Sequence, residues 1–183
     1  MNRKILPLLT AGLLLFLAAG CATPPEIPAP PKTQITLQEA RSFQNKILAD
    51  MGSYVEQEAV IGGMQSPIPR MAGLTCDWAA GSGGSDDISG VFLPGGYDLE
   101  VASGTDLDIV RSEIQETYAA LSGWETVWTD NDGDRELLVM SPQEYKFYLS
   151  AYVVGANGNL RLDISSFSPC LEAPEGFSLF DKY

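Results

Sequence analysis

The amino-acid sequence predicts an α+β fold, in which an antiparallel meander β-sheet carries two amphipathic helices packed on one face. Two observations lead to this prediction. Apolar residues recur at helical spacing in residues 37–51 and again in residues 107–121. Further along, Asp-Gly at 132–133 and Asn-Gly at 157–158 each separate two alternating runs, which is a strong signal for a β-hairpin. Such hairpins leave one apolar sheet face, and the helices supply the layer that covers it.

The first helix is expected to begin at Thr36, with Glu39 three residues later in a capping-box pattern, and to stop at Gly52. The second is expected to begin at Thr105 or Asp106 and to stop at Gly123. The apolar faces that indicate the two helices are Leu37, Ala40, Phe43, Ile47, Leu48 and Met51 in the first, and Leu107, Val110, Ile114, Thr117, Tyr118 and Leu121 in the second.

The segment between the helices is less regular. Residues 56–70 are rich in glycine and proline and are expected to form a loop. Residues 72–80 indicate a short strand that contains Cys76. Residues 88–103 suggest two strands that turn at Pro94-Gly95-Gly96.

The last third of the chain predicts four strands in two hairpins, 124–130 with 135–141 and 145–154 with 160–167. In the second hairpin, apolar residues occupy one face and polar residues the other, so one face is buried and one is mostly wet. The apolar set is Phe147, Leu149, Ala151 and Val153 on one strand and Leu160, Leu162 and Ile164 on the next.

The N-terminus has the composition of a secretory signal. Arg3 and Lys4 precede an apolar run from Ile5 to Ala19, which ends in small residues. As a helix this run would span about 22 Å, which is shorter than the roughly 30 Å hydrocarbon core of a bilayer. The run is therefore expected to be a signal peptide and not a resident span.

The sequence Ala-Ala-Gly before Cys21 resembles the lipobox of bacterial lipoproteins, although Ala18 stands where that family usually has leucine. The resemblance implies removal of residues 1–20 and attachment of fatty acyl chains such as palmitate to Cys21. The chain would then be anchored to a membrane on the extracytoplasmic side of the cell envelope. The alternative is a plain signal peptide, with Cys21 removed or left as a free thiol. Residues 21–34 are proline-rich and suggest an extended tether, which leaves residues 35–183 as a single domain.

With Cys21 lipidated, Cys76 and Cys170 would be the only thiols in an oxidising compartment, which predicts a disulfide between them. Its loop of about 95 residues would stabilise the fold by about 4 to 5 kcal/mol in the chain-entropy model. The alternative is a catalytic thiol with a resolving partner. The segments Cys76-Asp77-Trp78 and Ser168-Pro169-Cys170, together with the layout, resemble small actinobacterial lipoproteins of the mycobacterial Lpp type. This resemblance implies a disulfide-bridged envelope domain without an assigned activity.

The charge is strongly acidic. Removal of residues 1–20 takes away Arg3 and Lys4 and no acid, which changes the formal net charge from −13 to −15. Such a surface disfavours nucleic acid and anionic lipid as partners and would attract cations or basic proteins. Alternatively, the negative charge serves only to keep copies of a soluble secreted domain apart by repulsion.

Residue types argue against an enzyme and against a cofactor. The chain has no histidine, which excludes Ser-His-Asp and Cys-His catalysis and the usual zinc sites. It also lacks GxSxG, SxxK and the phosphate-binding glycine patterns. Asp130, Asp132 and Asp134 imitate part of a calcium loop, but the first and twelfth positions would be Trp128 and Val139, which are not oxygen ligands. A hairpin turn is the preferred interpretation of these aspartates.

Four aromatic residues are the candidate interaction site: Trp124, Trp128, Tyr148 and Tyr152. If their strand faces align, they form an aromatic patch on the outer side of the sheet. The alternative is that the first helix or the loop 56–70 covers them. We therefore expect a non-catalytic module that binds another envelope protein, or else a carrier that holds a small apolar molecule or a glycan on the same face. A hydrolase that uses two facing carboxylates in a cleft is the third and least favoured alternative.

Overall fold

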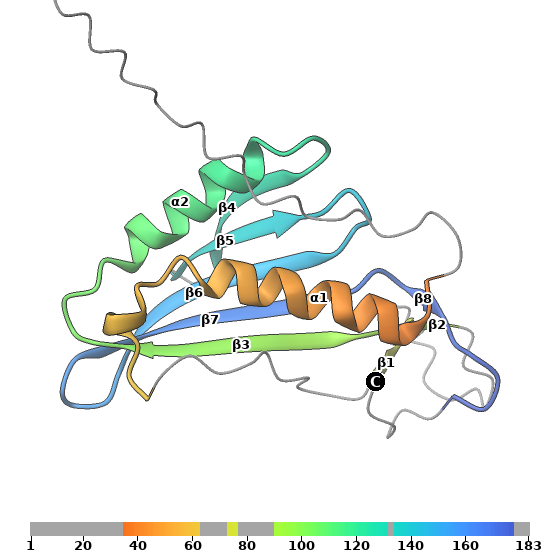
Figure 1. Ribbon diagram of the computed structural model, residues 1–183, viewed down its shortest axis with the longest axis horizontal. Coiled ribbons are helices and arrows are strands. Elements are labelled where there is room, and N and C mark those ends of the chain that lie inside the picture. Colours follow the sequence, from red (N-terminus) through yellow and green to blue (C-terminus); the bar gives the residue numbers. More distant parts are fainter. Residues whose placement is uncertain (1–34, 63–72, 77–89, 132–133, 178–183) are drawn as a thin grey trace, which may run out of the picture.

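A computed structural model describes residues 35–62, 73–76, 90–131 and 134–177 (Figure 1). Residues 1–34, with the expected signal peptide, Cys21 and tether, lie outside the described residues. The predicted α+β fold is confirmed, with two α-helices and two antiparallel sheets in this part of the chain. The helices are α1 (Leu37–Gly52), the short 3-10 helix η1 (Gln57–Ala59) and α2 (Leu107–Ala119). The strands are β1 (Leu74–Thr75), β2 (Gly90–Phe92), β3 (Pro94–Val101), β4 (Glu125–Asn131), β5 (Asp134–Met140), β6 (Lys146–Val154), β7 (Asn159–Phe167) and β8 (Leu171–Glu172).

Both helices begin as the sequence predicts. The amide of Thr36 donates to Glu39 Oε2 at 2.9 Å and the amide of Glu39 donates to Thr36 Oγ1 at 3.2 Å, which completes the capping box. The backbone hydrogen bond lowers the pKa of Glu39. At α2 the cap is Asp106, whose carboxylate accepts from the amides of Asp108 and Ile109 at 3.1 Å each.

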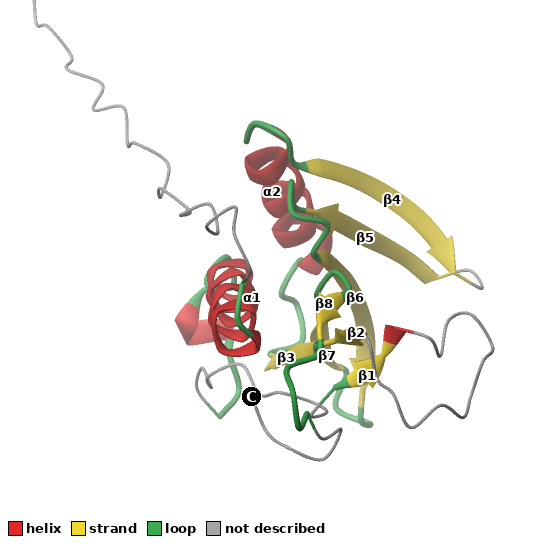
Figure 2. Ribbon diagram, turned by 90° about the vertical axis from the view of Figure 1, so that its right-hand side faces the viewer, coloured by secondary structure: helices red, strands yellow, loops and turns green. Residues whose placement is uncertain are grey.

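The helices lie on one face of the large sheet, as predicted, and the core lies between the two layers (Figure 2). Helix α1 packs mainly on β3 and β7, whereas α2 packs on β4, β5 and β6. The hydroxyl of Tyr118 in α2 donates to Asp50 Oδ2 of α1 at 2.7 Å, which joins the two helices. The largest fully buried side chains are Tyr118, Tyr145, Phe147, Ile47, Leu48, Met51, Leu93, Leu99, Ile114, Leu137, Leu149 and Leu162.

The large sheet has the order β3-β7-β6-β5-β4, so the predicted meander of four strands is present and β3 adds beside its last strand. The expected turn at Pro94-Gly95-Gly96 is wrong, because these residues are the first three of β3 and pair with β7. Gly95 instead allows close packing of its strand against neighbouring side chains. A Cβ there would lie 2.8 Å from Ser166 Oγ and 3.0 Å from Gln44 Cδ, so glycine lets α1 pack onto the strand.

The small sheet, of order β1-β2-β8, carries the disulfide. The predicted bond between Cys76 and Cys170 is confirmed, with a Cα–Cα distance of 5.9 Å. Gly90 of β2 makes room for it, since a Cβ at that position would lie 2.5 Å from Cys170 Sγ. The strand expected over residues 72–80 is limited in the described part to Leu74–Thr75. Cys170 lies between β7 and β8.

The pairing of β5 with β6 covers only part of these strands. It runs from Leu137 opposite Leu149 to Met140 opposite Lys146, whereas β6 and β7 pair over nine positions. The β4–β5 hairpin bends away from the rest of the sheet, as Figure 2 shows, and the pairing of β5 with β6 stops at Leu137. The buried Arg111 of α2 fills the resulting fork, where its Nη1 donates to the carbonyl oxygens of Arg135 and Leu149.

Candidate functional site

The two tryptophans lie on the helix-covered face of the sheet. Trp128 pairs with Leu137, which pairs with Leu149, and both leucines are fully buried. Residues paired directly across neighbouring strands share a face. Trp124 precedes β4 and packs edge-on against Tyr118 of α2, with ring centroids 4.8 Å apart. Both tryptophans therefore belong to the interface between the sheet and α2.

The ring of Trp128 is held by polar neighbours on that face. Its Nε1 donates to Gln115 Oε1 of α2 at 2.8 Å. The guanidinium carbons of Arg111 and Arg135 lie 5.1 and 4.1 Å from the ring centroid, within the range of cation–π attraction. These contacts give Trp128 a structural role at the fork between β5 and β6.

Tyr148 and Tyr152 lie on the opposite, outer face. Tyr148 pairs with Leu138, and Leu138 points to the opposite face from its neighbour, the buried Leu137. The side chain of Tyr152 is 42% exposed. The alternative that the first helix covers these tyrosines is wrong for α1, which packs on the other face. The four aromatic residues therefore form no common patch, and partner binding by the tyrosines stays a prediction.

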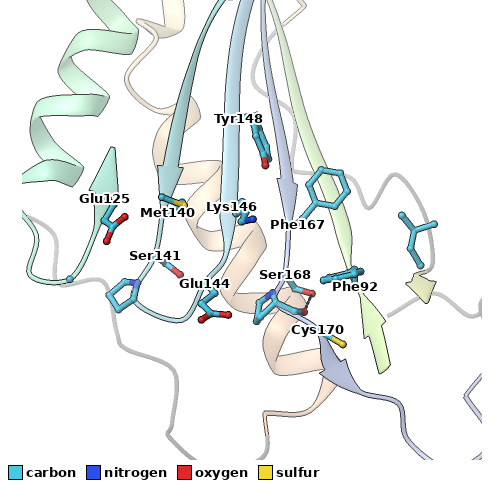
Figure 3. Close-up of a pocket in the computed structure, with 14 residues that line it drawn as sticks. Phe92, Glu125, Met140, Ser141, Glu144, Lys146, Tyr148, Phe167, Ser168 and Cys170 are labelled. Carbon is cyan, nitrogen blue, oxygen red and sulfur yellow. Dashed lines mark hydrogen bonds between the residues drawn. The ribbon is translucent and has the colours of Figure 1, made fainter. Parts of the chain in front are cut away.

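A groove of about 760 Å³ crosses the outer face at the end of the sheet next to the disulfide (Figure 3). It is lined by the beginning of β4, the end of β5, the beginning of β6, the end of β7 and the small sheet. Its charged lining residues are Glu125, Glu144 and Lys146. Its apolar and aromatic lining residues are Leu74, Phe92, Met140, Pro142, Tyr148, Phe167 and Pro169.

The sheet register sets the direction of this groove. Glu125 pairs with Met140, Met140 with Lys146, and Lys146 with Phe167, so one outer-face row crosses four strands. At about 4.8 Å between strands, the row is about 14 Å long. Tyr148, two residues further along β6 than Lys146, packs edge to face against Phe167 of this row, with ring centroids 6.2 Å apart. The groove therefore runs perpendicular to the strands across an aromatic pair.

The turn from β5 to β6 forms one wall of the groove and contains a strained residue. Glu144 has φ of 67°, a left-handed conformation that non-glycine residues rarely adopt. Ser141 fixes the turn: its amide donates to the carbonyl of Tyr145 at 2.9 Å, and its Oγ accepts from the amide of Tyr145 at 3.1 Å. The ring of Tyr145 is buried beneath, 4.8 Å from that of Phe43 in α1. The turn thus points Glu144 outward while anchoring the wall to the core.

The groove supports binding better than covalent chemistry. The two serine hydroxyls in its lining are used by the backbone: Ser141 as just described, and Ser168, whose Oγ accepts from the amide of Leu93 at 2.9 Å. Burial raises the pKa of Tyr148, with a smaller contribution from the charge of Glu136. The Tyr148 hydroxyl therefore stays neutral at physiological pH and can both donate and accept a hydrogen bond.

The described residues contain no group of three His, Cys, Asp or Glu side chains placed to hold a metal ion. Of the calcium-loop candidates, Asp130 and Asp134 are exposed on the β4–β5 hairpin. Asp132 lies outside the described residues. The structure thus gives no set of ligands on which to argue a metal centre.

Phe167 is the groove residue that sequence reasoning missed. It ends an alternating run in which Asp163 and Ser165 point to the wet face, and it has the same phase. The available signal was a large aromatic residue at a position where the alternation points the side chain to the solvent-exposed face of the sheet. Phe92 gave no such signal, because the small sheet that positions it was not predicted.

The fold is an α+β domain with an open groove, lined in part by aromatic side chains, on the uncovered face of its sheet. No protein-family model, curated protein or solved structure matches the chain. In the described part of the chain, each helix is too short or too polar to cross a membrane.

Proposed function

We propose that this protein is a membrane-anchored envelope lipoprotein that acts as a non-catalytic binding module. Its outer-face groove would hold an extended segment of another envelope protein. The observation that carries the proposal is the open row of aromatic and apolar side chains around Tyr148 and Phe167, since aromatic residues are enriched at protein interfaces. The lipid anchor rests on the sequence around Cys21.

The dimensions of the groove suit a short extended segment. An extended chain advances about 3.3 Å per residue, so the row of about 14 Å takes about four residues. Glu125 at the β4 end of the row, Lys146 within the row and Glu144 on the turn would select the charges of that segment. Tyr148 and Phe167 would supply the apolar contact at little entropic cost, because their rings are already packed together.

Chemical cross-linking in intact cells of the native host tests this function. Lys146 is exposed and lines the groove, so an amine-reactive linker placed there should capture the partner for mass spectrometry. Tyr148→Ser and Phe167→Ser should each reduce the captured partner several-fold. Tyr152→Ser is the matched control, because Tyr152 is an exposed tyrosine of the same strand face that does not line this groove.

Equal capture by all three variants would contradict the proposal, as would the absence of any partner above background. A large loss of thermal stability in Tyr148→Ser would show instead that this ring belongs to the core.

A second function is favoured by the size of the groove. Its volume of about 760 Å³ is within the range of about 300 to 1,000 Å³ that is typical of small-molecule pockets. A carrier of a small apolar molecule or a glycan would use the same aromatic pair. Native mass spectrometry of protein purified from the host distinguishes the two functions, because a carrier should retain a small molecule that Phe167→Ser loses.

A further inference from the structure

The two edges of the large sheet differ in how they are protected. The outer edge of β3 is covered where Val60 forms a bridge with Val101. There the amide of Ile61 donates to the carbonyl of Glu100 at 2.8 Å, and the amide of Ala102 donates to that of Ala59 at 2.9 Å. At the opposite edge, β4 has β5 on one side and no strand on the other within the described residues. We propose that this edge of β4 binds an extended basic segment of a partner protein as an additional antiparallel strand.

The orientation of the β4 backbone follows from the fork. Arg111 Nη1 donates to the carbonyl of Arg135, so that carbonyl points toward β6 and away from β4. Backbone groups alternate in direction along an antiparallel strand. The residues of β5 that face β4 are therefore the even-numbered ones, and their partners in β4 are odd-numbered. The amides and carbonyls of Thr126 and Trp128 consequently point to the outer edge.

The edge lacks several of the features that usually prevent strand addition. Strand β4 contains no proline and no lysine, and its register with β5 is continuous from Glu125 to Asn131, without a bulge. Its centre, from Thr126 to Thr129, is uncharged and consists of β-branched and aromatic residues that favour strands. Val127 on the outer face is 45% exposed and would be covered by a neighbouring strand.

Charge selects the occupant. The uncharged centre is flanked by exposed acids, Glu125 and Asp130. A second copy of this chain would bring another formal charge of −13 and place acids near acids. A segment with basic residues opposite Glu125 and Asp130 is complementary, so the partner is basic and not a second copy.

These positions define a sequence pattern. In an antiparallel strand the residues opposite Asp130, Val127 and Glu125 are the first, fourth and sixth, which gives basic, apolar and basic residues in that order. The hexapeptide acetyl-Lys-Thr-Thr-Val-Thr-Lys-amide is a probe with this pattern. Its third and fifth residues would lie opposite Trp128 and Thr126 and exchange backbone hydrogen bonds with them. Its second and fourth amides would face away.

The test measures binding of the dye-labelled peptide to the full chain in detergent micelles by fluorescence anisotropy. N-methylation of the third and fifth peptide amides should weaken binding about tenfold or more, because two backbone hydrogen bonds are lost. N-methylation of the second and fourth amides should leave binding within about twofold. The same peptide with glutamate in place of both lysines should not bind.

A protein variant gives an independent check. Thr126→Pro removes an amide that points away from β5, so β4 can keep its pairing while losing a donor to the peptide. It should weaken binding about tenfold, whereas Thr126→Val, which keeps the amide, should not. Phe167→Ser should also leave peptide binding unchanged, because Phe167 lies on β7, which β6 and β5 separate from β4, and Glu125 is the residue that the groove and the edge share.

Three results would overturn the inference. The first is that the unmodified peptide does not bind at about millimolar concentration, at which weak strand addition would still be detected. The second is that both N-methylated peptides bind equally well. The third is that the lysine and glutamate peptides bind equally well. Dimerisation of the full chain that Thr126→Pro abolishes would assign the edge to a second copy. The N-methylated peptides use the unaltered protein, so the test does not depend on the folding of any variant.

Discussion

Replacement of the buried Arg111 by methionine should destabilise the fold at the fork between β5 and β6. The Arg111 residue is 5% exposed, and its Nη1 donates to the carbonyl of Arg135, at a position beyond the last pair of the β5–β6 ladder. Methionine has similar length and apolar character, so packing is largely kept. What is lost is a charged donor to a carbonyl and the attraction to the ring of Trp128.

The expected size of the effect follows from these contacts. A hydrogen bond from a charged donor is worth about 1.5 to 3 kcal/mol, and a cation–π contact about 1 kcal/mol. The bond to the carbonyl of Leu149 is long, at 3.4 Å, and adds little. Arg111 Nε is buried without a hydrogen-bond partner among the described residues, and relief of that cost offsets part of the loss. We expect a net loss of about 2 to 3 kcal/mol in the free energy of unfolding, or about 5 to 10 °C in Tm.

Urea unfolding of the oxidised protein, followed by circular dichroism, measures this loss. Arg111→Lys should lie between the wild type and Arg111→Met, because lysine keeps one charged donor but loses the planar stack on Trp128. Asp108→Asn is the control for the ion pair alone. The Asp108 side chain is 74% exposed, so its removal should change the free energy by less than about 1 kcal/mol. An Arg111→Met variant as stable as the wild type would refute the role assigned to this arginine.

Three further predictions concern the disulfide and the turn beside the groove. Cys76→Ser opens a loop closed over a separation of 94 residues and should cost about 4 to 5 kcal/mol under non-reducing conditions, so an unchanged Tm would mean that the bond contributes nothing. Burial raises the pKa of Tyr145 to about 12 from 10, so the native state holds this proton more tightly and stability should fall as pH rises from about 10 through 12. Tyr145→Phe should reduce that alkaline loss without lowering stability at pH 8, since the buried hydroxyl has no hydrogen-bond partner in the described part of the chain; urea unfolding at pH 8 and pH 11 checks both statements. Glu144→Gly should raise Tm by a few degrees by relieving the positive φ of 67°, and a lower Tm in thermal unfolding would show that the turn is not strained.

Local signals predicted the elements well where the determinants are close in sequence. Thr36 and Glu39 indicated the start of α1 because capping depends on residues within one turn. The Asn-Gly at 157–158 indicated the β6–β7 turn because it favours the backbone twist that joins two strands. Pro94-Gly95-Gly96 misled for the opposite reason: Gly95 is required by its close approach to Gln44 and Ser166, which are distant in sequence.

The relation between faces of different strands could not be predicted. Alternation shows that Trp124 and Trp128 share a phase, but their side relative to Tyr148 depends on the register of β5 and β6. That register is set by the turn that Ser141 holds together, for which the sequence carries no standard signature. The candidate patch therefore divided between two faces.

The pattern of apolar residues likewise did not predict which charged side chains are buried. Arg111 lies on the same face of α2 as Val110 and Ile114, and all three are buried. Its position is explained by the hydrogen bond that it donates to the carbonyl of Arg135, which lies in the fork beyond the last pair of β5 with β6. Arg41 of α1 repeats the situation, since its buried guanidinium donates to the carbonyl of Pro94.

The position of β3 has a consequence for the order of assembly. Strands β4 to β7 join by short connections and, with α2, can form early from contacts local in sequence. Strand β3 reaches β7 only across the whole meander, because Gly95 pairs with Ser166. It should therefore join late, and the disulfide beside it closes on a sheet that is already built. Until then β7 presents an unpaired edge, so the newly made chain passes through a stage at which a chaperone, or another copy, can occupy the place of its own strand.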